Sequence, residues 1–478
     1  MRKTKIICTI GPSTDDENVF REMMKAGMNV ARFNFSHSTY EEHKKRFELV
    51  ERLRNELDLP VATLLDTKGP EIRLKNFKDN KPVDIRDGDE FTLTTRDVEG
   101  DAEIASVTFE HLPKDVSIGS AILINDGVIE LKVKSIQGED IICDVIHGGT
   151  LSNHKGINVP GVKLSMPYIS DDDMHDLEFG AKMRYDFIAA SFVRTGADVV
   201  YLRKFTQSLG WYDVRIIAKI ENMDGVENID EILEASDGVM VARGDMGVEI
   251  PFEQIPAIQK DIIHKAYNAG KVVITATQML ESMINNPRPT RAEITDVANA
   301  IYDGTSALML SGETAAGKFP VEAVKTMALI AETTENNINY EKRFRNRDDL
   351  NSKEVAQSRS VTEAISHATV TTAHDLNAKA IVTVTKRGGT ARMLSKYRAD
   401  CPIIGLTTDP TTLRQLSMSW GVLPGLISEQ TNTDDLITTA IDAAISKGWL
   451  SHGDLAVITA GVPLGISGNT NLIKVETV

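Results

Sequence analysis

Two spacings of apolar residues alternate along most of this chain. Short runs of branched apolar residues, typical of buried strands, are followed by stretches with apolar residues at helical spacing. Strands that alternate with helices favour parallel pairing through right-handed crossovers. Before residue 70 the pattern predicts strands over Lys3–Ile10, Asn29–Phe35 and Val61–Asp66, with helices over Asp16–Ala26 and Tyr40–Leu57.

The alternation is interrupted from about Pro70 to Ser165, where short strands are separated by Gly, Asp and Asn turns. This interruption predicts a small antiparallel β domain, a barrel, inserted into a larger domain. Afterwards the pattern predicts helices over Asp171–Gly180 and Met223–Ala235, and strands over Asp186–Ser191, Arg215–Glu221, Asp237–Ala242, Lys271–Thr277 and Ser306–Leu310. Three strands before the insertion and five after it predict a (β/α)8 TIM barrel.

A polar segment, Asn336–Ser358, is interpreted as a helix end followed by a linker. The chain beyond it predicts a C-terminal open-sheet α/β domain, with helices over Thr362–Leu376, Thr390–Tyr397, Thr411–Ser419 and Thr433–Lys447 and strands over Ala380–Val384, Ile403–Thr407, Leu455–Ala460 and Leu472–Glu476. We therefore expect a catalytic barrel formed by residues 1–69 and 166–340, an inserted β-barrel lid domain over 70–165, and the α/β domain over 341–478.

Composition narrows the possible partners and the compartment. The formal net charge of −16 argues against nucleic acid and against an anionic membrane as partners. The three cysteines, Cys8, Cys143 and Cys401, lie far apart and in no metal-ligand spacing, which fits a reducing cytoplasm. The apolar run near the N-terminus is too short for a signal peptide or a membrane span. We expect a cytoplasmic protein.

Charged residues stand at the carboxyl ends of two predicted strands. Side chains alternate along a strand, so Lys219 and Glu221 share one face, and Asp245 closely follows the next strand. A buried Lys–Glu pair alone is compatible with a structural ion pair. Two acidic groups on neighbouring strand ends favour instead a divalent cation such as Mg²⁺. A metal beside a lysine indicates phosphate or enolate chemistry.

Polar side chains also end the second, third and seventh strands. Arg32, Asn34 and Ser36 share a face, which a half-buried strand also explains, and Asp66 and Thr67 follow the third strand. Arg32 is suited to hold a phosphate or carboxylate, and the neighbouring oxygen donors suggest a monovalent-cation site. Two further observations have ordinary explanations: Thr275 and Thr277 share a face, as packed threonines do, and Arg73 and Lys155 on the lid resemble solvated surface charges.

Six segments of the sequence, in this order, resemble the pyruvate kinase family. They are NVARFNFSH, LLDTKGPEIR, IIAKIENMDG, VMVARGDMGVEIP, ITATQMLESMINNPRPTRAE and LMLSGETAAGKFP. Several long motifs at the family's spacing make this resemblance specific. It implies transfer of the phosphoryl group of phosphoenolpyruvate to ADP, giving pyruvate and ATP in the last step of glycolysis.

The resemblance also implies roles for individual residues. Lys219 would stabilise the phosphoryl group in transit and the enolate oxygen, and Arg32 would hold the transferring phosphate. Thr277, with the backbone amides of Gly244 and Asp245, would bind the substrate carboxylate, and Thr277 would help to deliver the proton. Mg²⁺ (or Mn²⁺) would be held by Glu221 and Asp245, K⁺ by Asn34, Ser36, Asp66 and Thr67, and the nucleotide by Asn34, His37, Arg73 and Lys155. Glu71 resembles the motif of K⁺-dependent members.

Regulation and assembly are implied by the same resemblance. Family members often bind a sugar phosphate in a loop of the last domain, which here consists of Thr385, Lys386, Arg387, Gly388, Gly389 and Thr390. Arg387 stands where a small hydroxyl residue is common, which leaves the ligand of this loop open. The resemblance implies a regulatory and oligomerisation role for the C-terminal domain, and a homotetramer.

Two other functions remain open on sequence grounds. A Mg²⁺-dependent aldolase or lyase of oxo-acids would share Lys219, Glu221 and Asp245, but it would not need a lid with Arg73 and Lys155. A non-catalytic, effector-binding relative would be expected to lack one of the residues carried over to the site, and none is missing.

Overall fold

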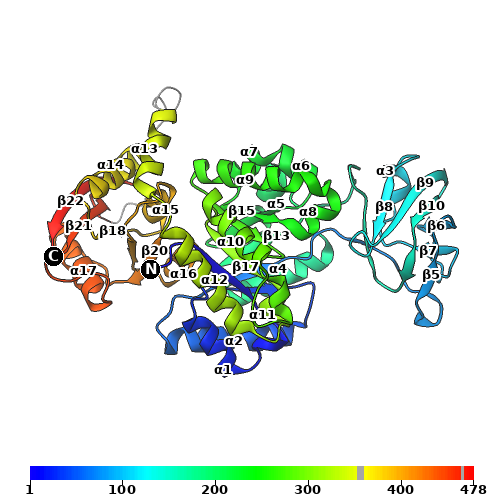
Figure 1. Cartoon of the computed structure of the whole chain (residues 1–478), viewed down its shortest axis with the longest axis horizontal. Helices are drawn as coiled ribbons and strands as arrows, with labels where there is room; N and C mark the ends of the chain where they lie inside the picture. The colour runs from blue at the N-terminus through cyan, green and yellow to red at the C-terminus, as the bar shows by residue number, and fades with distance from the viewer. Residues whose placement is uncertain (352–359, 465–467) are drawn as a thin grey trace.

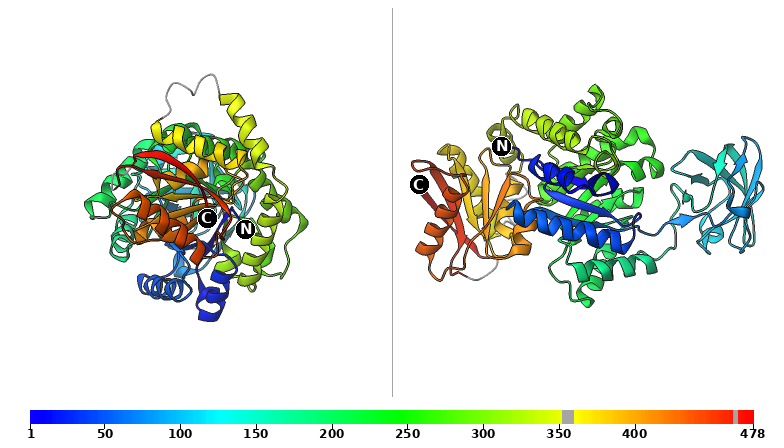
Figure 2. Two further views of the ribbon diagram at one scale, coloured as in Figure 1. Left: turned by 90° about the vertical axis from the view of Figure 1, so that its left-hand side faces the viewer. Right: turned by 90° about the horizontal axis from the view of Figure 1, so that it is seen from below.

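The computed structural model describes residues 1–351, 360–464 and 468–478. The molecule is elongated, with the C-terminal α/β domain, the barrel and the inserted β domain following one another along its long axis (Figure 1). Viewed along that axis, the C-terminal sheet lies in front of the barrel (Figure 2). Within the described residues, no helix is long and apolar enough to cross a membrane.

Eight parallel strands close into the central barrel, each paired with its neighbours in chain order. They are β1 (Lys5–Thr9), β2 (Val30–Asn34), β3 (Ala62–Asp66), β13 (Phe187–Ala190), β14 (Arg215–Ile220), β15 (Gly238–Ala242), β16 (Val272–Ala276) and β17 (Ala307–Leu310). The helices that accompany them are α1 (Glu17–Lys25), α2 (Tyr40–Glu56), α4 (Asp171–Met183), α5 (Gly196–Ser208), α6 (Met223–Glu227), α7 (Ile229–Ala235), α8 (Arg243–Glu249), α9 (Ile255–Ala269), α10 (Arg291–Asp303), α11 (Gly312–Ala315) and α12 (Pro320–Glu335). The predicted TIM barrel, with three strands before the insertion and five after it, is confirmed.

Alternate residues of the barrel strands belong to two separate cores. Leu64, Ile217 and Ile274 pack in the barrel interior. Their neighbours, such as Leu65 and Ala218, pack outward in the core that contains the surrounding helices. This two-residue period determines which side chains reach the barrel mouth, because a residue two positions beyond an interior side chain lies on the same face.

The inserted domain is a second, smaller barrel. Its strands are β4 (Ile72–Arg73), β5 (Val83–Ile85), β6 (Glu90–Thr94), β7 (Ile104–Ser106), β8 (Ala121–Ile124), β9 (Ile129–Gln137), β10 (Asp140–His147), β11 (Gly149–Leu151) and β12 (Gly156–Asn158), with a short helix, α3 (Leu112–Asp115). Seven of them form one sheet in the order β4-β12-β8-β9-β10-β6-β7. The two edges meet, because the Lys75 N–H donates to Ser106 O at 2.8 Å and the Thr108 N–H donates to Arg73 O at 2.9 Å.

A five-stranded sheet forms the centre of the C-terminal domain, in the order β20-β19-β18-β21-β22. The strands are β18 (Ala380–Val384), β19 (Ile403–Thr407), β20 (Val422–Leu426), β21 (Leu455–Gly461) and β22 (Thr470–Thr477), and the helices are α13 (Tyr340–Asn351), α14 (Val361–Asp375), α15 (Gly389–Lys396), α16 (Pro410–Leu416) and α17 (Thr433–Ser446). The open α/β sheet is as predicted, except that β20 was not expected. This strand contains Pro424, and it lies at an edge of the sheet, where a missing N–H is tolerated.

Two helix predictions need correction. The segment over Met223–Ala235 forms two helices, α6 and α7, which meet at Asn228. The segment over Asn336–Ser358 is not a helix end and linker throughout, because α12 ends at Glu335 and a separate helix, α13, follows it. The remainder of that prediction, from residue 352 onward, lies outside the described residues.

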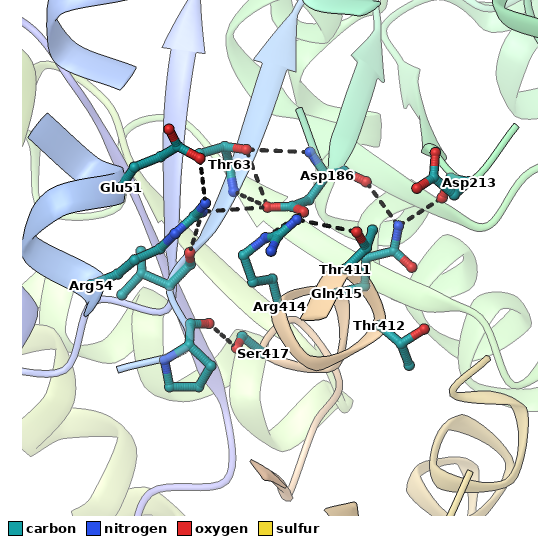
Figure 3. A network of polar contacts seen from close by, with 12 residues as sticks. Glu51, Arg54, Thr63, Asp186, Asp213, Thr411, Thr412, Arg414, Gln415 and Ser417 are labelled. Atoms are coloured by element: carbon teal, nitrogen blue, oxygen red, sulfur yellow. Dashed lines mark hydrogen bonds and ion pairs between the residues drawn. The ribbon is translucent and has the colours of Figure 1, made fainter. Parts of the chain in front are cut away.

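The C-terminal domain contacts the amino end of the barrel through a buried polar cluster (Figure 3). Asp186, just before β13, accepts a hydrogen bond from Arg414 Nε of α16 at 2.8 Å and another from the Thr63 N–H at 2.9 Å. Gln415 Nε2 donates to the backbone oxygens of Asp186 and Asp213. These contacts join α16 to the start of β13 and leave the carboxyl end of the barrel to the inserted domain.

Candidate active site

Lys219 lies at the mouth of the barrel, near the end of β14 and almost fully buried. Its Nζ contacts three oxygens: Ser191 Oγ at 2.7 Å, Glu221 Oε1 at 2.8 Å and Asp66 Oδ1 at 3.2 Å. Burial lowers the pKa of Lys219, but the carboxylates of Asp66, Glu221 and Asp245 outweigh it and hold this pKa above its usual value. The side chain is therefore a buried ammonium group.

Glu221 is fully buried beside this ammonium group. Its Oε2 accepts a hydrogen bond from the Phe192 N–H at 2.5 Å, while Oε1 faces Lys219. Burial and the nearby Asp245 carboxylate raise the pKa of Glu221, against the opposing effect of Lys219. A buried carboxylate whose pKa is raised by desolvation and by a neighbouring carboxylate indicates a site where an added cation is favourable.

Asp66 connects the lysine to Arg32. Arg32 Nε donates to Asp66 Oδ2 at 2.6 Å, and Arg32 Nη1 donates to Thr9 Oγ1 at 2.8 Å. Burial alone raises the pKa of Asp66, but Arg32 and Lys219 together hold it below its usual value. Asp66 is thus a carboxylate shared by two cationic side chains.

A cavity of about 920 Å³ opens above these residues, between the barrel mouth and the inserted domain. Its walls include the predicted site residues Arg32, Asn34, Ser36, His37, Thr67, Glu71, Arg73, Lys155, Lys219, Glu221 and Asp245. Asp66, Gly244 and Thr277 are not among the residues that line it. Asn34, at the end of β2, accepts a hydrogen bond from the Ser36 N–H at 3.1 Å, which orders the turn that follows.

The two lid cations occupy different surroundings. Arg73 in β4 forms an ion pair with Glu71, and its Nη1 donates to His154 O at 3.0 Å. Lys155 directly precedes β12, the strand paired with β4, so both residues lie on the same part of the lid. The insertion therefore places two cationic side chains along the cavity wall, one of them already paired.

Thr277 stands beyond the end of β16 in an unusual backbone conformation. Its φ is +68° and that of Gln278 is +54°, in the left-handed region that a β-branched residue rarely adopts. The strand ends at Ala276, so the alternation that links Thr277 to Thr275 does not extend to it. The Gly244 N–H donates to Thr277 Oγ1 at 2.8 Å, so this amide, expected to meet a substrate carboxylate, already has a partner here.

The Thr277 turn is fixed by a residue to which the sequence analysis gave no role. Arg243 Nη2 donates to Thr277 O at 2.6 Å, and Arg243 Nη1 contacts both carboxylate oxygens of Asp296, at 2.9 and 2.7 Å. In the sequence, the only sign that Arg243 belongs to the site is that it directly precedes Gly244 and Asp245. Ser191 was missed as well, although it ends the predicted strand Asp186–Ser191 on the interior face, and the period-two rule applied to this strand identifies it.

The expected effector loop lies far from this site, against the amino end of the barrel. Gly388, with φ +77°, precedes α15, and the Thr390 and Thr470 hydroxyls are 2.6 Å apart. Arg387 O accepts from Arg392 Nη2 at 2.6 Å and from Arg215 Nη2 of β14 at 3.4 Å. The loop is therefore in contact with the barrel strand that carries Lys219.

Together, the eightfold barrel, the cationic cluster at its carboxyl end and the cavity under an inserted β domain define a barrel enzyme suited to an anionic substrate. Comparison with known proteins identifies the family. The model of the pyruvate kinase barrel domain matches residues 1–324, and that of the pyruvate kinase alpha/beta domain matches residues 363–476.

Similar proteins extend this match over the whole chain. It is 48% identical to a pyruvate kinase of Clostridium acetobutylicum over 100% of both chains. It is 50% identical to a pyruvate kinase of Staphylococcus aureus, covering 81% of that protein. The crystal structure of a pyruvate kinase from Cryptosporidium parvum superposes with a TM-score of 0.93 at 41% identity, covering 100% of this chain and 96% of the other.

The chain belongs to the pyruvate kinase family. Its reaction is the transfer of the phosphoryl group of phosphoenolpyruvate to ADP, which gives pyruvate and ATP. Enzymes of this family generally use Mg²⁺ and K⁺.

Proposed function

We propose that this chain carries out phosphoryl transfer at the carboxyl end of its barrel, with Lys219 as the central cation. The observation that carries the proposal is the position of the Lys219 ammonium group at the cavity wall, between Asp66, Glu221 and Ser191. A phosphoryl group in transit spreads negative charge over its oxygens and needs positioning and cations rather than a strong nucleophile. Lys219 stabilises that charge and the enolate oxygen, and Arg32 holds the transferring phosphate.

Glu221 and Asp245 are the proposed ligands of Mg²⁺ or Mn²⁺. Both line the cavity, and carboxylate oxygens are the ligands that Mg²⁺ prefers. The described residues contain no group of three or more His, Cys, Asp or Glu side chains arranged for a metal. We propose that substrate oxygens and water complete the coordination. When bound, the metal would neutralise phosphate charge and polarise the substrate oxygens.

We assign K⁺ to the oxygen donors at the ends of β2 and β3, namely Asn34, Ser36, Asp66 and Thr67. Three of them line the cavity, and Asp66 lies between Arg32 and Lys219. The nucleotide contacts are Asn34, His37, Arg73 and Lys155. Closure of the insertion over this wall would exclude water, which otherwise diverts the phosphoryl group to hydrolysis.

Thr277 supports delivery of the proton to the enolate carbon through a water molecule. It does so from the strained turn that Arg243 holds. The Gly244 and Asp245 amides, near the start of α8, would meet the substrate carboxylate once Thr277 releases the Gly244 N–H. This exchange couples carboxylate binding to a change in the partner of the Thr277 hydroxyl.

Regulation and assembly belong to the C-terminal domain in this proposal. A sugar phosphate would bind at residues 385–390, where backbone amides, Lys386 and Arg387 precede α15. The division into a barrel (1–69 and 166–340), a lid (70–165) and a regulatory domain (341–478), the homotetramer and the cytoplasmic location are part of the same proposal. Pairing of β4 with β12 supports the lid boundaries, because the chain enters and leaves the insertion side by side.

The decisive experiment measures pyruvate formation from phosphoenolpyruvate and ADP with Mg²⁺ and K⁺. Parallel reactions contain fructose 1,6-bisphosphate, glucose 6-phosphate, ribose 5-phosphate or AMP. We expect turnover that requires Mg²⁺, and a shift of the phosphoenolpyruvate saturation curve with one phosphate effector. Turnover that persists after complete removal of divalent cations would contradict the assignment of Glu221 and Asp245 as metal ligands. A phosphoenolpyruvate saturation curve that no effector changes would contradict the assignment of residues 385–390 as an effector loop.

A further inference from the structure

Ser191 follows β13 directly and is 2% exposed. Its hydroxyl donates a hydrogen bond to Thr67 O at 2.7 Å. A hydroxyl has a single proton to donate, so the contact of 2.7 Å with Lys219 Nζ is one in which the ammonium group donates and Ser191 accepts. The direction of both bonds is therefore fixed.

Thr67 holds Ser191 from two sides. The Ser191 N–H donates to Thr67 Oγ1 at 3.0 Å, in addition to the hydroxyl bond to Thr67 O. Thr67 is in turn attached to the same strand, because its N–H donates to Ala189 O at 3.0 Å. The backbone bond holds Ser191 in place beside Thr67. Any other rotamer of its side chain would break the bonds of the hydroxyl to Thr67 O and to Lys219.

The three acceptors around Lys219 differ in kind. Glu221 and Asp66 are carboxylates, and both also contact other groups, while Ser191 is the neutral acceptor. Of the three, only Ser191 accepts a well-aligned hydrogen bond from Lys219 Nζ, and the two carboxylate oxygens contact it as ion pairs. An entering phosphoryl oxygen competes with these oxygens for the ammonium N–H groups, and the neutral hydroxyl is the weakest competitor for a charged donor.

We propose that Ser191 is a positioning residue for the phosphoryl transfer, and this rests on the proposed role of Lys219. Ser191 holds the lysine N–H in the direction of the cavity until the phosphoryl oxygen takes its place, so the ammonium group needs no reorientation during the reaction. Glu221 and Asp66 contact the ammonium group as ion pairs, and Ser191 directs it.

The test replaces Ser191 by Ala in the full-length protein. We expect kcat to fall by about 10- to 100-fold, the range typical of groups that orient a catalytic side chain, with the KM for phosphoenolpyruvate changed less than about twofold. Ser236→Ala is the matched control, because Ser236 is also a buried serine, 2% exposed, and it precedes β15 at the opposite end of the barrel. The control should leave both constants close to those of the unmodified enzyme.

Ser191→Cys keeps the side-chain volume and offers only a weak acceptor, so it should reproduce the loss if the alanine variant folds poorly. A crystal structure of either variant should show Lys219 Nζ displaced toward Glu221 and Asp66. A kcat equal to that of Ser236→Ala, or an unmoved Lys219, would overturn the role of Ser191. Because Lys219→Met tests the lysine itself, these results separate failure of this inference from failure of the proposed function.

Discussion

Buried charge gathers at both ends of the barrel, and the two clusters are built differently. At the amino end, both Asp186 carboxylate oxygens accept hydrogen bonds from Arg414 and Thr63, and Arg54 lies 4.0 Å away. At the carboxyl end, Asp66 Oδ1 and Glu221 Oε1 have no well-aligned hydrogen bond, although each contacts Lys219.

The two clusters also differ in their access to the large cavity. None of Asp186, Arg54 and Arg414 lines the large cavity, whereas Lys219, Glu221 and Arg32 do. A buried ion pair by itself is weak evidence of function. Access to a cavity and unsatisfied acceptors therefore distinguish the cluster proposed to be reactive from the structural one.

The largest effect is expected from Lys219→Met. We expect kcat to fall by about 1,000-fold or more, because the variant loses the cation proposed to stabilise the transferring group. Mg²⁺-dependent binding of phosphoenolpyruvate, followed by calorimetry, should remain. The control is Lys271→Met, because Lys271 lies beside the amino end of the barrel and donates to Ser236 O. If the two variants turned over at similar rates, Lys219 would have no special role.

Asp186→Asn tests the other cluster. Removal of the Asp186 charge leaves the Arg414 guanidinium without its charged partner in a buried place. We therefore expect a loss of about 3 to 5 kcal/mol in the free energy of unfolding. The activity of the folded enzyme should change little. Urea denaturation measures the loss. Asp213→Asn is the control at the same interface, because Asp213 contributes only its backbone oxygen to Gln415. Equal losses in the two variants would contradict the structural role of the Asp186 carboxylate.

Exchange of K⁺ for Na⁺ tests the donors next to the reactive cluster. At constant ionic strength and saturating substrates, we expect turnover to be several-fold faster in K⁺, because the oxygens at the ends of β2 and β3 would hold a positive charge beside the substrate. The assay is the formation of pyruvate in each salt. Equal rates in both salts would contradict the assignment of Asn34, Ser36, Asp66 and Thr67.

The smallest effect concerns Lys5, which is buried at the amino end and donates to Val422 O at 2.7 Å. Burial, with a contribution from Arg2, lowers the pKa of Lys5 to about 7. Between pH 7 and 10 the unfolded chain therefore binds more protons at this position than the folded chain, so stability rises with pH in that window.

Lys5→Met should remove this contribution and reduce the slope of the free energy of unfolding by up to about 1.4 kcal/mol per pH unit. Urea denaturation at pH 7, 8 and 9 measures the slope. Lys379→Met is the control, because Lys379 is exposed and directly precedes a strand, β18. An unchanged slope in Lys5→Met would show that the lysine keeps its charge when buried.

Much of this architecture follows from local pattern. The alternation of side chains brings Lys219 and Glu221 together, because period two is a property of the extended backbone itself. The barrel also follows from local pattern, because each of its eight strands is recognised from its own run of apolar residues and the eight alternate with helices. The roles proposed for the site residues depended on the family resemblance, since no periodicity distinguishes a metal ligand from a structural carboxylate.

The features that could not be predicted depend on tertiary contacts. The left-handed conformation of Thr277 is held by Arg243 and Asp296 from other segments, and nothing next to Thr277 in the sequence specifies it. The edge strand β20 contains a proline that argues against a strand unless its place in the sheet is known. The pairing of Asp186 with Arg414 joins residues 228 positions apart, which no local pattern reports.

The strand β13 has only four residues, and it separates Asp186 from Ser191 by about 17 Å at the usual rise per residue. One extra or missing residue in it would turn Ser191 to the outer face, since side chains reverse with each step. The same change would move Asp186 out of reach of α16 if Ser191 kept its place. The length of this segment is therefore constrained independently of its packing, so an insertion or deletion should disrupt both ends of the barrel at once, whereas a substitution acts only on the core that it contacts.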